Sequence, residues 1–331
     1  MQGSRRCVLV TGAAGFIGYH VCQALLDGGA RIVGIDNLND YYDPALKSAR
    51  LARLTDRDGF VFEKLDIADH EAILALVETH PEITGIIHLA AQAGVRYSLV
   101  NPYAYVQANV MGQVVMLEAC RRLPALEHFV YASSSSVYGG NTGLPFAVQD
   151  RVDNPVSLYA ATKRSQELLA HCYAHLHRLP MTGLRFFTVY GPWGRPDMAA
   201  YIFTKAIFEG QPIRVFNHGD MKRDFTYIDD IVAGALAALD RPPADTGAEP
   251  PHRVYNLGNH RSEDLMHFVE LIEKACGREA IKEFGDMQPG DVKETFAEIE
   301  ASRRDLAFEP RTAIDEGIPR FVAWYRDYHG V

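Results

Sequence analysis

The chain has 331 residues, of which 47% are hydrophobic and 23% charged, a composition that excludes a disordered protein. This length accommodates one large α/β unit or two modest domains. The formal net charge of −9 argues against a nucleic-acid partner, so binding of an anionic ligand would depend on locally placed arginines. The sequence shows neither a signal-peptide pattern nor a run of about 18 apolar residues. We therefore expect no membrane partner and a location in the cytoplasm.

The cysteines give no sign of metal binding or of redox chemistry. They lie far apart and form no C-x-x-C pair, and an odd number does not suit a disulfide framework. We therefore expect no metal site and buried, reduced thiols at Cys7, Cys22, Cys120, Cys172 and Cys276.

The first half of the chain alternates short apolar runs with helical patterns. Between the first two runs, Ile17, Val21 and Leu25 recur every four residues, which predicts one face of a helix. Val- and Ile-rich strands separated by helices predict a doubly wound parallel sheet of the Rossmann type, covered on both faces. The predicted buried strands are residues 7–10, 31–35, 60–62, 85–89, 127–131 and 182–187.

The pattern of apolar and turn-forming residues changes after residue 190. Residues 191–196 form a turn-rich junction, and residues 241–251 form a loop rich in Pro, Ala and Gly. Shorter, mixed helices and strands follow. We therefore expect a Rossmann domain over residues 1–180 and a smaller mixed α/β domain over residues 181–331. Some later segments, such as 229–239 and 254–257, are expected to return to the first domain.

A glycine-rich turn follows the first predicted strand and opens the first helix. In residues 11–18 (TGAAGFIG), Gly12 permits a tight turn, Gly15 lets the backbone approach a pyrophosphate, and Gly18 lets helix and strand pack closely. The positive end of the helix dipole then faces the phosphates. Asp36 ends the second strand, where an acid binds the adenosine ribose and repels a 2′-phosphate. This combination predicts binding of NAD rather than NADP.

Other residues near the carboxyl ends of strands extend the expected cofactor site. Asp66, at the end of the third strand, is placed to reach the adenine, although aspartates are common at strand ends. The fourth strand is expected to close with Leu89, Ala90 and Ala91, where small side chains leave room for a ligand in the crevice of the sheet. The expected cofactor contacts are Gly12, Gly15, Phe16, Ile17, Gly18, Asp36, Asn37, Asp66, Ile67, Leu89, Ala90, Ala91, Tyr159 and Lys163.

The candidate catalytic residues are a tyrosine and a lysine one helical turn apart. An ammonium at Lys163 favours the phenolate of Tyr159 and lowers its pKa from about 10, which makes Tyr159 a candidate general base. Residues 133–136 are four serines at the end of the fifth strand, where a hydroxyl can hydrogen-bond the group being oxidised. Either pattern alone is common by chance, as a helix surface or a turn. Their order behind the dinucleotide motif favours a functional role.

These motifs resemble a known family. Residues 11–18, the run 133–139 (SSSSVYG) and the Tyr159–Lys163 pair match the extended short-chain dehydrogenases in order and spacing. Longer segments, spread nearly end to end, are similar to the UDP-glucuronate 4-epimerases: 36–44 (DNLNDYYDP), 185–196 (RFFTVYGPWGRP), 222–230 (KRDFTYIDD), 288–292 (QPGDV) and 321–325 (FVAWY).

The resemblance implies a mechanism. Tyr159 takes the proton of the sugar 4-hydroxyl while hydride passes from C4 to tightly bound NAD, and Ser134 hydrogen-bonds the 4-oxygen. Lys163 holds the nicotinamide ribose and tunes Tyr159. The keto sugar turns over and hydride returns to its other face, so no net redox change occurs. The first domain would then bind NAD and the second the nucleotide sugar.

The serine run bears on the choice of substrate. Related dehydratases carry an Asp-Glu pair in this run, and related decarboxylases carry a glutamate where Ser136 stands, so the resemblance favours epimerisation. Gln288 replaces an arginine of UDP-galactose 4-epimerases, which puts a galactose substrate in doubt. Donors to a uronate carboxylate are expected at Ser135, Ser136, Thr188 and Arg195; Arg96 is expected near the sugar, and Arg223 at the UDP phosphates.

Other functions remain open at this stage. An enzyme with the same scaffold could act on another UDP-sugar such as UDP-galactose, or it could decarboxylate UDP-glucuronate. An alternative of a different functional class is a non-catalytic protein that senses NAD. An intact Tyr159–Lys163 pair argues against the sensor. A purely structural role would not explain why so many separate motifs follow the order and spacing of the family. We also expect a homodimer, as in the family; Val110, Val114 and Leu117 in the predicted helix 102–122 belong either to the core or to a dimer face.

Overall fold

The computed structural model describes residues 6–287 and 292–331, so Gln288 and most of the 288–292 motif lie outside the described residues. Its contacts divide the chain into two compact units. Unit 1 comprises Met1–Gly139, Arg151–Arg185 and Val232–Tyr255, and unit 2 comprises Gly140–Asp150, Phe186–Ile231 and Asn256–Val331. The assignment of cofactor binding to residues 1–180 and of sugar binding to residues 181–331 stays a prediction.

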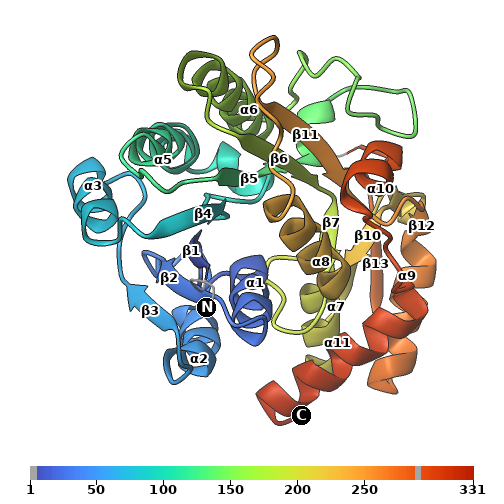
Figure 1. Cartoon of the computed structure of the whole chain (residues 1–331). Coiled ribbons are helices and arrows are strands. Elements are labelled where there is room, and N and C mark those ends of the chain that lie inside the picture. Colours follow the sequence, from blue (N-terminus) through green and yellow to red (C-terminus); the bar gives the residue numbers. More distant parts are fainter. Residues whose placement is uncertain (1–5, 288–291) are drawn as a thin grey trace. The chain divides into compact units, whose positions relative to one another are not determined.

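The described residues contain a seven-stranded sheet in the order β11-β6-β5-β4-β1-β2-β3 (Figure 1). The pairs β3–β2, β2–β1, β1–β4 and β4–β5 are parallel. The strand order reverses between β1 and β4, and open α/β sheets bind ligands at the carboxyl ends of strands at such a point. The prediction of a doubly wound Rossmann sheet is confirmed. Its strands are β1 (Cys7–Thr11), β2 (Arg31–Ile35), β3 (Phe60–Glu63), β4 (Ile83–His88), β5 (His128–Ser134), β6 (Met181–Phe186) and β11 (His252–Leu257).

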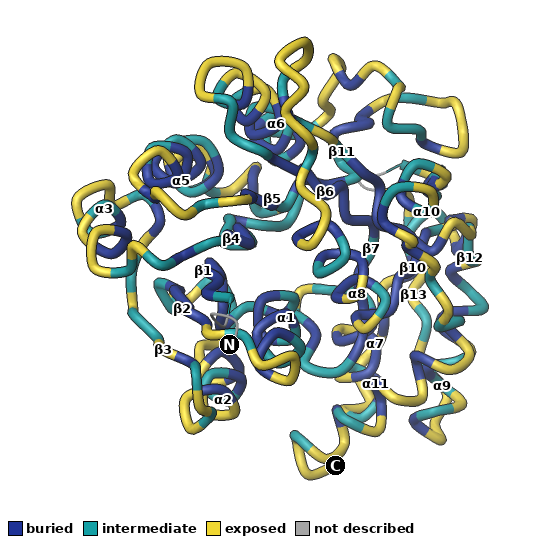
Figure 2. Tube along the Cα trace, in the orientation of Figure 1, coloured by how far each residue is buried: buried dark blue, intermediate teal, exposed yellow. Residues whose placement is uncertain are grey.

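Helices cover both faces of this sheet, with α1 and α2 on one face and α3, α5 and α6 on the other (Figure 1). Side chains fix where several of them begin: Asp43, Asp69 and Ser157 each accept a hydrogen bond from a backbone N–H in the first turn of the following helix. The central strands and the inward helix faces are mostly buried, whereas the edge strand β3 is partly exposed (Figure 2). The helices are α1 (Phe16–Asp27), α2 (Pro44–Thr55), α3 (His70–Thr79), α5 (Gly112–Cys120), α6 (Leu158–His177) and α8 (Ile228–Leu239).

The predicted helix 102–122 is not uniform. It consists of α4 (Pro102–Tyr105), the wider π-helical turn η2 (Val106–Met111) and α5. A π-turn inserts an extra residue into the helix and is frequent at functional sites. Leu117 is completely buried in the core of unit 1, whereas Val110 and Val114 are half-buried. Leu117 therefore belongs to the core and not to a dimer face.

Unit 2 is built from short strand pairs and helices. β7 (Thr188–Tyr190) pairs with β10 (Phe225–Tyr227), β9 (Lys222–Arg223) with β12 (Glu263–Asp264), and β8 (Ile213–Phe216) with β13 (Lys282–Gly285). Aromatic rings fill its core, as in the stacked Phe225–Phe268 pair, whose centroids are 4.0 Å apart. Its helices are α7 (Ala199–Glu209), α9 (Leu265–Cys276), α10 (Glu300–Leu306) and α11 (Ile314–His329).

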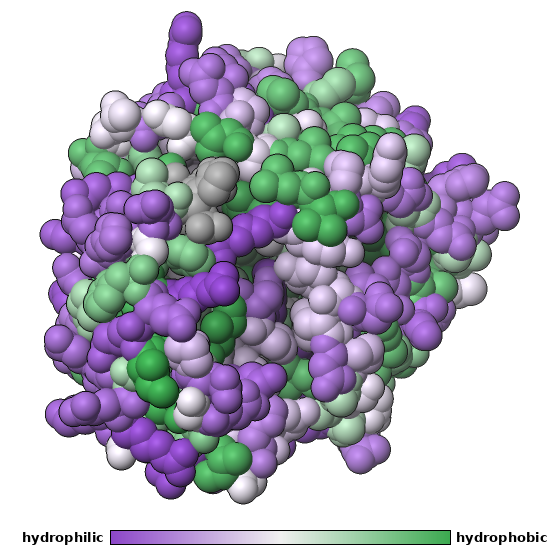
Figure 3. All heavy atoms as spheres, turned by 180° about the vertical axis from the view of Figure 1, so that it is seen from behind, coloured by the Kyte–Doolittle hydropathy of each residue, from purple (hydrophilic) through white to green (hydrophobic). Residues whose placement is uncertain are grey.

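The surface is mostly hydrophilic on the side shown in Figure 3, with apolar residues in separate groups. All cysteines are unpaired and four are buried, but Cys172 is exposed. The expectation of burial is wrong for Cys172 because it lies on the outward face of α6. Within residues 6–287 and 292–331, no helix has the length and apolar character needed to cross a membrane. The same residues contain no cluster of three His, Cys, Asp or Glu side chains suited to a metal ion.

Candidate active site

The glycine-rich turn between β1 and α1 leaves no room for side chains at its glycine positions. Gly12 has φ +73°, and a Cβ on it would lie 2.8 Å from the backbone nitrogen of Ala90. A Cβ on Gly18 would lie 2.0 Å from the carbonyl oxygen of Gly12. Gly15 precedes α1, and no side chain caps this helix end. The first backbone N–H groups of α1 can therefore bind an anion such as a pyrophosphate.

Thr11, the last residue of β1, fixes the segment after β4. Its hydroxyl oxygen accepts hydrogen bonds from the backbone N–H groups of Leu89 (3.1 Å) and Ala90 (3.0 Å). It also lies 2.7 Å from Nδ1 of His88, whose pKa burial lowers to about 3, so that the ring is neutral. These bonds hold Leu89, Ala90 and Ala91 beside the glycine turn. β4 ends at His88, so the three residues follow the strand instead of closing it.

Asp36 follows β2 and is bound to the glycine turn. Its carboxylate accepts hydrogen bonds from the backbone N–H groups of Ala14 (3.2 Å) and Leu38 (2.9 Å), and burial raises its pKa. The Asn37 amide donates to Asp66 over 2.9 Å. β3 ends at Glu63, so Asp66 lies in the following turn and not at the strand end. Residues 11–18 form a cradle that fits the pyrophosphate of a dinucleotide, and Asp36 beside this glycine cradle fits its adenosine ribose.

Replacing Gly18 by alanine is expected to disrupt this cradle. The new methyl group cannot lie 2.0 Å from the Gly12 carbonyl, so α1 must shift, with an expected loss of about 1–3 kcal/mol in the free energy of unfolding. Urea unfolding and the dinucleotide content of the purified protein measure the effect. Gly28→Ala is the matched control, because it lies at the other end of α1 and its Cβ would meet its nearest neighbour at 3.4 Å. Equal losses in both variants would contradict the proposed role of Gly18.

The candidate catalytic pair lies in the first turns of α6. Tyr159 is half-buried, and Lys163, one turn later, is only 2% exposed and donates to the carbonyl oxygen of Ala132 over 2.8 Å. Burial lowers the pKa of Lys163 to about 7, against the opposing effect of the Glu167 carboxylate. The Lys163–Ala132 bond joins α6 to the end of β5, where Ser134 accepts a hydrogen bond from the backbone N–H of Ser136 over 3.2 Å. The structure thus brings the tyrosine–lysine turn and the serine run together.

A buried ion network behind this pair was missed from the sequence. Glu167 lies one turn after Lys163 and accepts hydrogen bonds from Ser133 Oγ (2.7 Å), from Arg164 (2.9 Å), and from Nε and Nη2 of Arg185 (2.8 and 2.9 Å). Glu167 and Arg185 are 1% and 2% exposed. The spacing of Glu167 from Lys163 was the one available signal, because it places both on the same face of a helix.

A second missed residue is Asn109 in the wide turn η2. Its side chain is fully buried and exchanges two hydrogen bonds with the backbone of Gln92, at 2.8 and 3.0 Å. It also donates to Thr162 Oγ1 over 3.0 Å. The ring of Tyr105, one turn earlier, packs edge-on against Tyr159 with centroids 6.0 Å apart. Both contacts fix the loop after β4 against the helix that carries Tyr159.

The remaining candidates of unit 1 occupy different environments. Ser135 and Ser136 are half-buried in η3 (Ser135–Tyr138). Arg96 is exposed at the start of η1 (Arg96–Leu99). Phe16 is buried and Ile17 half-buried in the first turn of α1. Ile67 is 5% exposed and fills the space beside Gly112, which makes its side chain part of the core.

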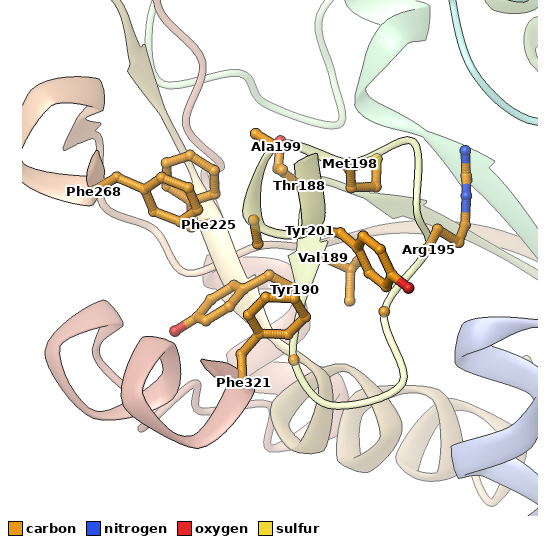
Figure 4. A pocket seen from close by; sticks show the side chains of 13 residues that line it. Thr188, Val189, Tyr190, Arg195, Met198, Ala199, Tyr201, Phe225, Phe268 and Phe321 are labelled. Carbon is orange, nitrogen blue, oxygen red and sulfur yellow. The ribbon is translucent and has the colours of Figure 1, made fainter. Parts of the chain in front are cut away.

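Unit 2 carries the other three candidates. Thr188 and Arg195 line the same small pocket, together with aromatic residues of α9 and α11 (Figure 4). Arg195 points away from these rings and forms a two-point ion pair with Asp197, at 3.0 and 2.5 Å. Arg223 does not line this pocket. It donates to the carbonyl oxygens of Lys222 (2.8 Å) and Lys293 (3.0 Å).

Comparison with known proteins agrees with this geometry. Residues 8–258 match the model of the "NAD dependent epimerase/dehydratase family". A probable UDP-glucuronate 4-epimerase of Rhizobium meliloti (strain 1021) is 48% identical over 96% of each chain. UDP-glucuronate 4-epimerase 4 of Arabidopsis thaliana is also 48% identical, over 97% of this chain and 76% of its own. The solved UDP-glucuronic acid 4-epimerase of Bacillus cereus, in complex with UDP-glucuronic acid and NAD, has a TM-score of 0.88 and 35% identity and covers 97% of this chain and 99% of its own. The chain belongs to the NAD dependent epimerase/dehydratase family.

Proposed function

We propose that this protein is an isomerase that interconverts UDP-glucuronate and UDP-galacturonate through a 4-keto sugar, with NAD as a tightly bound cofactor. The observation that carries the proposal is the docking of the Tyr159–Lys163 turn onto the serine-bearing end of β5 by the 2.8 Å Lys163–Ala132 bond. This pair lies in the same unit as the glycine cradle and Asp36. The similarity to UDP-glucuronate 4-epimerases over nearly the whole chain supports the choice of sugar.

NAD supplies the reversible transfer of hydride from and to C4 of the sugar. The Tyr159 oxygen accepts the proton of the 4-hydroxyl as the C4–H bond breaks and gives it back to the 4-oxygen when that bond reforms on the opposite face. Ser134 holds the 4-oxygen, and Lys163 favours the ionised form of Tyr159 by its charge. Each turnover therefore ends with the cofactor in its starting state.

The uronate carboxylate is expected to contact Ser135, Ser136, Thr188 and Arg195, with Arg96 near the sugar and Arg223 at the diphosphate. No residue of the run 133–136 carries a carboxylate, so the run lacks the acid found in related dehydratases and decarboxylases. Epimerisation is therefore favoured over decarboxylation of UDP-glucuronate, and the uronate donors favour glucuronate over another UDP-sugar such as UDP-galactose.

Proton NMR of the purified protein with UDP-glucuronate, without added NAD, tests this proposal. The expected product is UDP-galacturonate, identified by the coupling constants of H4, in a mixture that reaches the same composition from either sugar. Appearance of UDP-xylose or of a 4-keto pentose would mean that decarboxylation is the reaction. Bound NAD with no conversion of any UDP-sugar would favour the NAD sensor.

Replacing Arg195 by methionine is expected to lower kcat/KM for UDP-glucuronate by about ten- to a hundredfold, because a charge-assisted pair with the carboxylate is lost. The effect should lie near the lower end, since the substrate must displace Asp197 from Arg195. Activity on UDP-glucose, which has no carboxylate, should change much less. Arg214→Met, at an exposed position of β8, is the control. An equal loss with both sugars would contradict a role for Arg195 in recognising the carboxylate.

We also propose that the protein is a homodimer. Leu168, Cys172 and Leu176 recur every four residues on α6 and are exposed, Leu168 by 55% and Leu176 by 63%. An apolar stripe of this kind suits a two-fold interface between copies of the chain. Light scattering should give about twice the chain mass of 36.8 kDa, and Leu168→Glu should reduce it to one chain. Val61→Glu, at an exposed apolar residue of β3, should leave the dimer intact; a wild-type mass of one chain would refute the proposal.

A location in the cytoplasm stays a prediction from the sequence.

A further inference from the structure

Two loops at the carboxyl edge of the sheet meet through a pair of tyrosines. Tyr41 lies in the loop after β2 and Tyr97 in η1, beyond the loop after β4; their ring centroids are 4.9 Å apart. β2 and β4 are not neighbours, because β1 lies between them. The tyrosine contact therefore joins loops that follow the two strands flanking β1. The glycine cradle begins at the end of β1.

Buried side chains fix both of the loops that carry this contact. In the loop after β2, the Lys47 ammonium donates to the backbone oxygen (2.8 Å) and the side-chain oxygen (2.7 Å) of Asn39. Arg50, which is fully buried, donates to Tyr42 Oη (2.8 Å) and to the carbonyl oxygen of Ala14 in the glycine turn (3.0 Å). These bonds tie the loop to both α2 and the cradle.

The loop after β4 is held by Tyr105. Its hydroxyl donates to the carbonyl oxygens of Ala93 (2.9 Å) and Gly94. Its ring lies 6.3 Å from the Tyr97 ring and 6.0 Å from the Tyr159 ring. A continuous row of aromatic rings therefore runs from the loop after Asp36 to the candidate catalytic tyrosine.

We propose that Tyr41 and Tyr97 form a clasp across the end of β1 that slows the release of the bound dinucleotide. This function explains why two half-buried surface loops are each braced by buried polar side chains to keep one aromatic contact. It also suits a reaction in which the cofactor is reduced and reoxidised within one turnover, because loss of the reduced form would leave the sugar oxidised. The inference rests on the proposed NAD cofactor but not on the identity of the sugar.

A double-mutant cycle on the two tyrosines tests the clasp. Bound NAD is exchanged against labelled NAD, and its rate of release is followed in wild type, Tyr41→Ala, Tyr97→Ala and the double variant. Each single variant should release NAD about tenfold faster, the order expected for a lost aromatic contact together with its burial. The double variant should be no faster than the faster single variant, because both substitutions remove the same contact between the two rings.

Matched variants separate the ring contact from general loosening of the fold. Tyr41→Phe and Tyr97→Phe keep the rings and should release NAD at the wild-type rate. Phe284→Ala removes a ring that is 52% exposed in unit 2 and should not change the rate. Unchanged release from both alanine variants, or rate increases that multiply in the double variant, would overturn the clasp. A wild-type protein that binds no NAD would instead overturn the proposed function.

Discussion

Replacing Tyr159 by phenylalanine is expected to lower kcat for epimerisation by roughly a thousandfold, within the range usual for loss of a general acid–base group. The hydroxyl that accepts and returns the proton of the sugar is lost, while the ring can still pack against Tyr105. Folding and NAD content should therefore stay close to those of wild type. Initial rates of UDP-galacturonate formation at saturating substrate measure the effect.

Tyr103→Phe is the matched control for this substitution. It removes the same hydroxyl from a side chain that is 82% exposed, and the rate should not change. If Tyr159→Phe kept more than about a tenth of the wild-type rate, another residue would have to be the base, because the expected contribution is at least about a hundredfold.

Replacing Arg185 by leucine is expected to cost about 3–5 kcal/mol in the free energy of unfolding. Arg185 and Glu167 are almost completely buried, and their two-point bond is the main compensation for burying the carboxylate. Without Arg185, Glu167 keeps only Ser133 and the more exposed Arg164 as partners. Urea unfolding of the cofactor-loaded protein measures the loss, which should come with reduced activity because Ser133 adjoins Ser134.

Arg178→Leu is the control for the Arg185 variant. Arg178 also binds a carboxylate at two points, that of Asp245, but both side chains are about one-third exposed. Water can replace the lost partner there, so the unfolding midpoint should move little. Similar shifts in the two variants would show that burial does not govern the strength of these pairs.

Much of the fold could be predicted from the sequence because its signals are local. Each strand of the Rossmann sheet up to β6 is a short apolar run between turn residues, and the 3.6-residue period of α1 is clear. The prediction of a uniform helix over residues 102–122 was wrong, because no residue pattern predicts a π-turn. Its wide turn instead accompanies the burial of Asn109, whose partners Gln92 and Thr162 are distant in the sequence.

The candidate site was predictable where it follows from motifs and missed where it depends on contacts between segments. The glycine cradle with Asp36 and the Tyr159–Lys163 turn beside Ser134 were predictable because a single residue spacing or a single strand end marks each of these features. Glu167 gains its role only when α6, β5 and β6 meet, so the sequence shows it as one more charged residue of a helix. Pairing of Arg195 with Asp197, and of Tyr41 with Tyr97, likewise appears only in the folded chain.

The fate of the hydrogen at C4 tests the central claim most directly. UDP-glucuronate carrying deuterium at C4 is incubated with the purified protein in ordinary water, without added NAD, and the product is analysed by NMR and mass spectrometry. We expect UDP-galacturonate that keeps the deuterium at C4, because the same hydrogen leaves and returns within the bound cofactor. Product with the deuterium exchanged for solvent hydrogen, or product that has lost its carboxylate, would contradict epimerisation by a retained NAD.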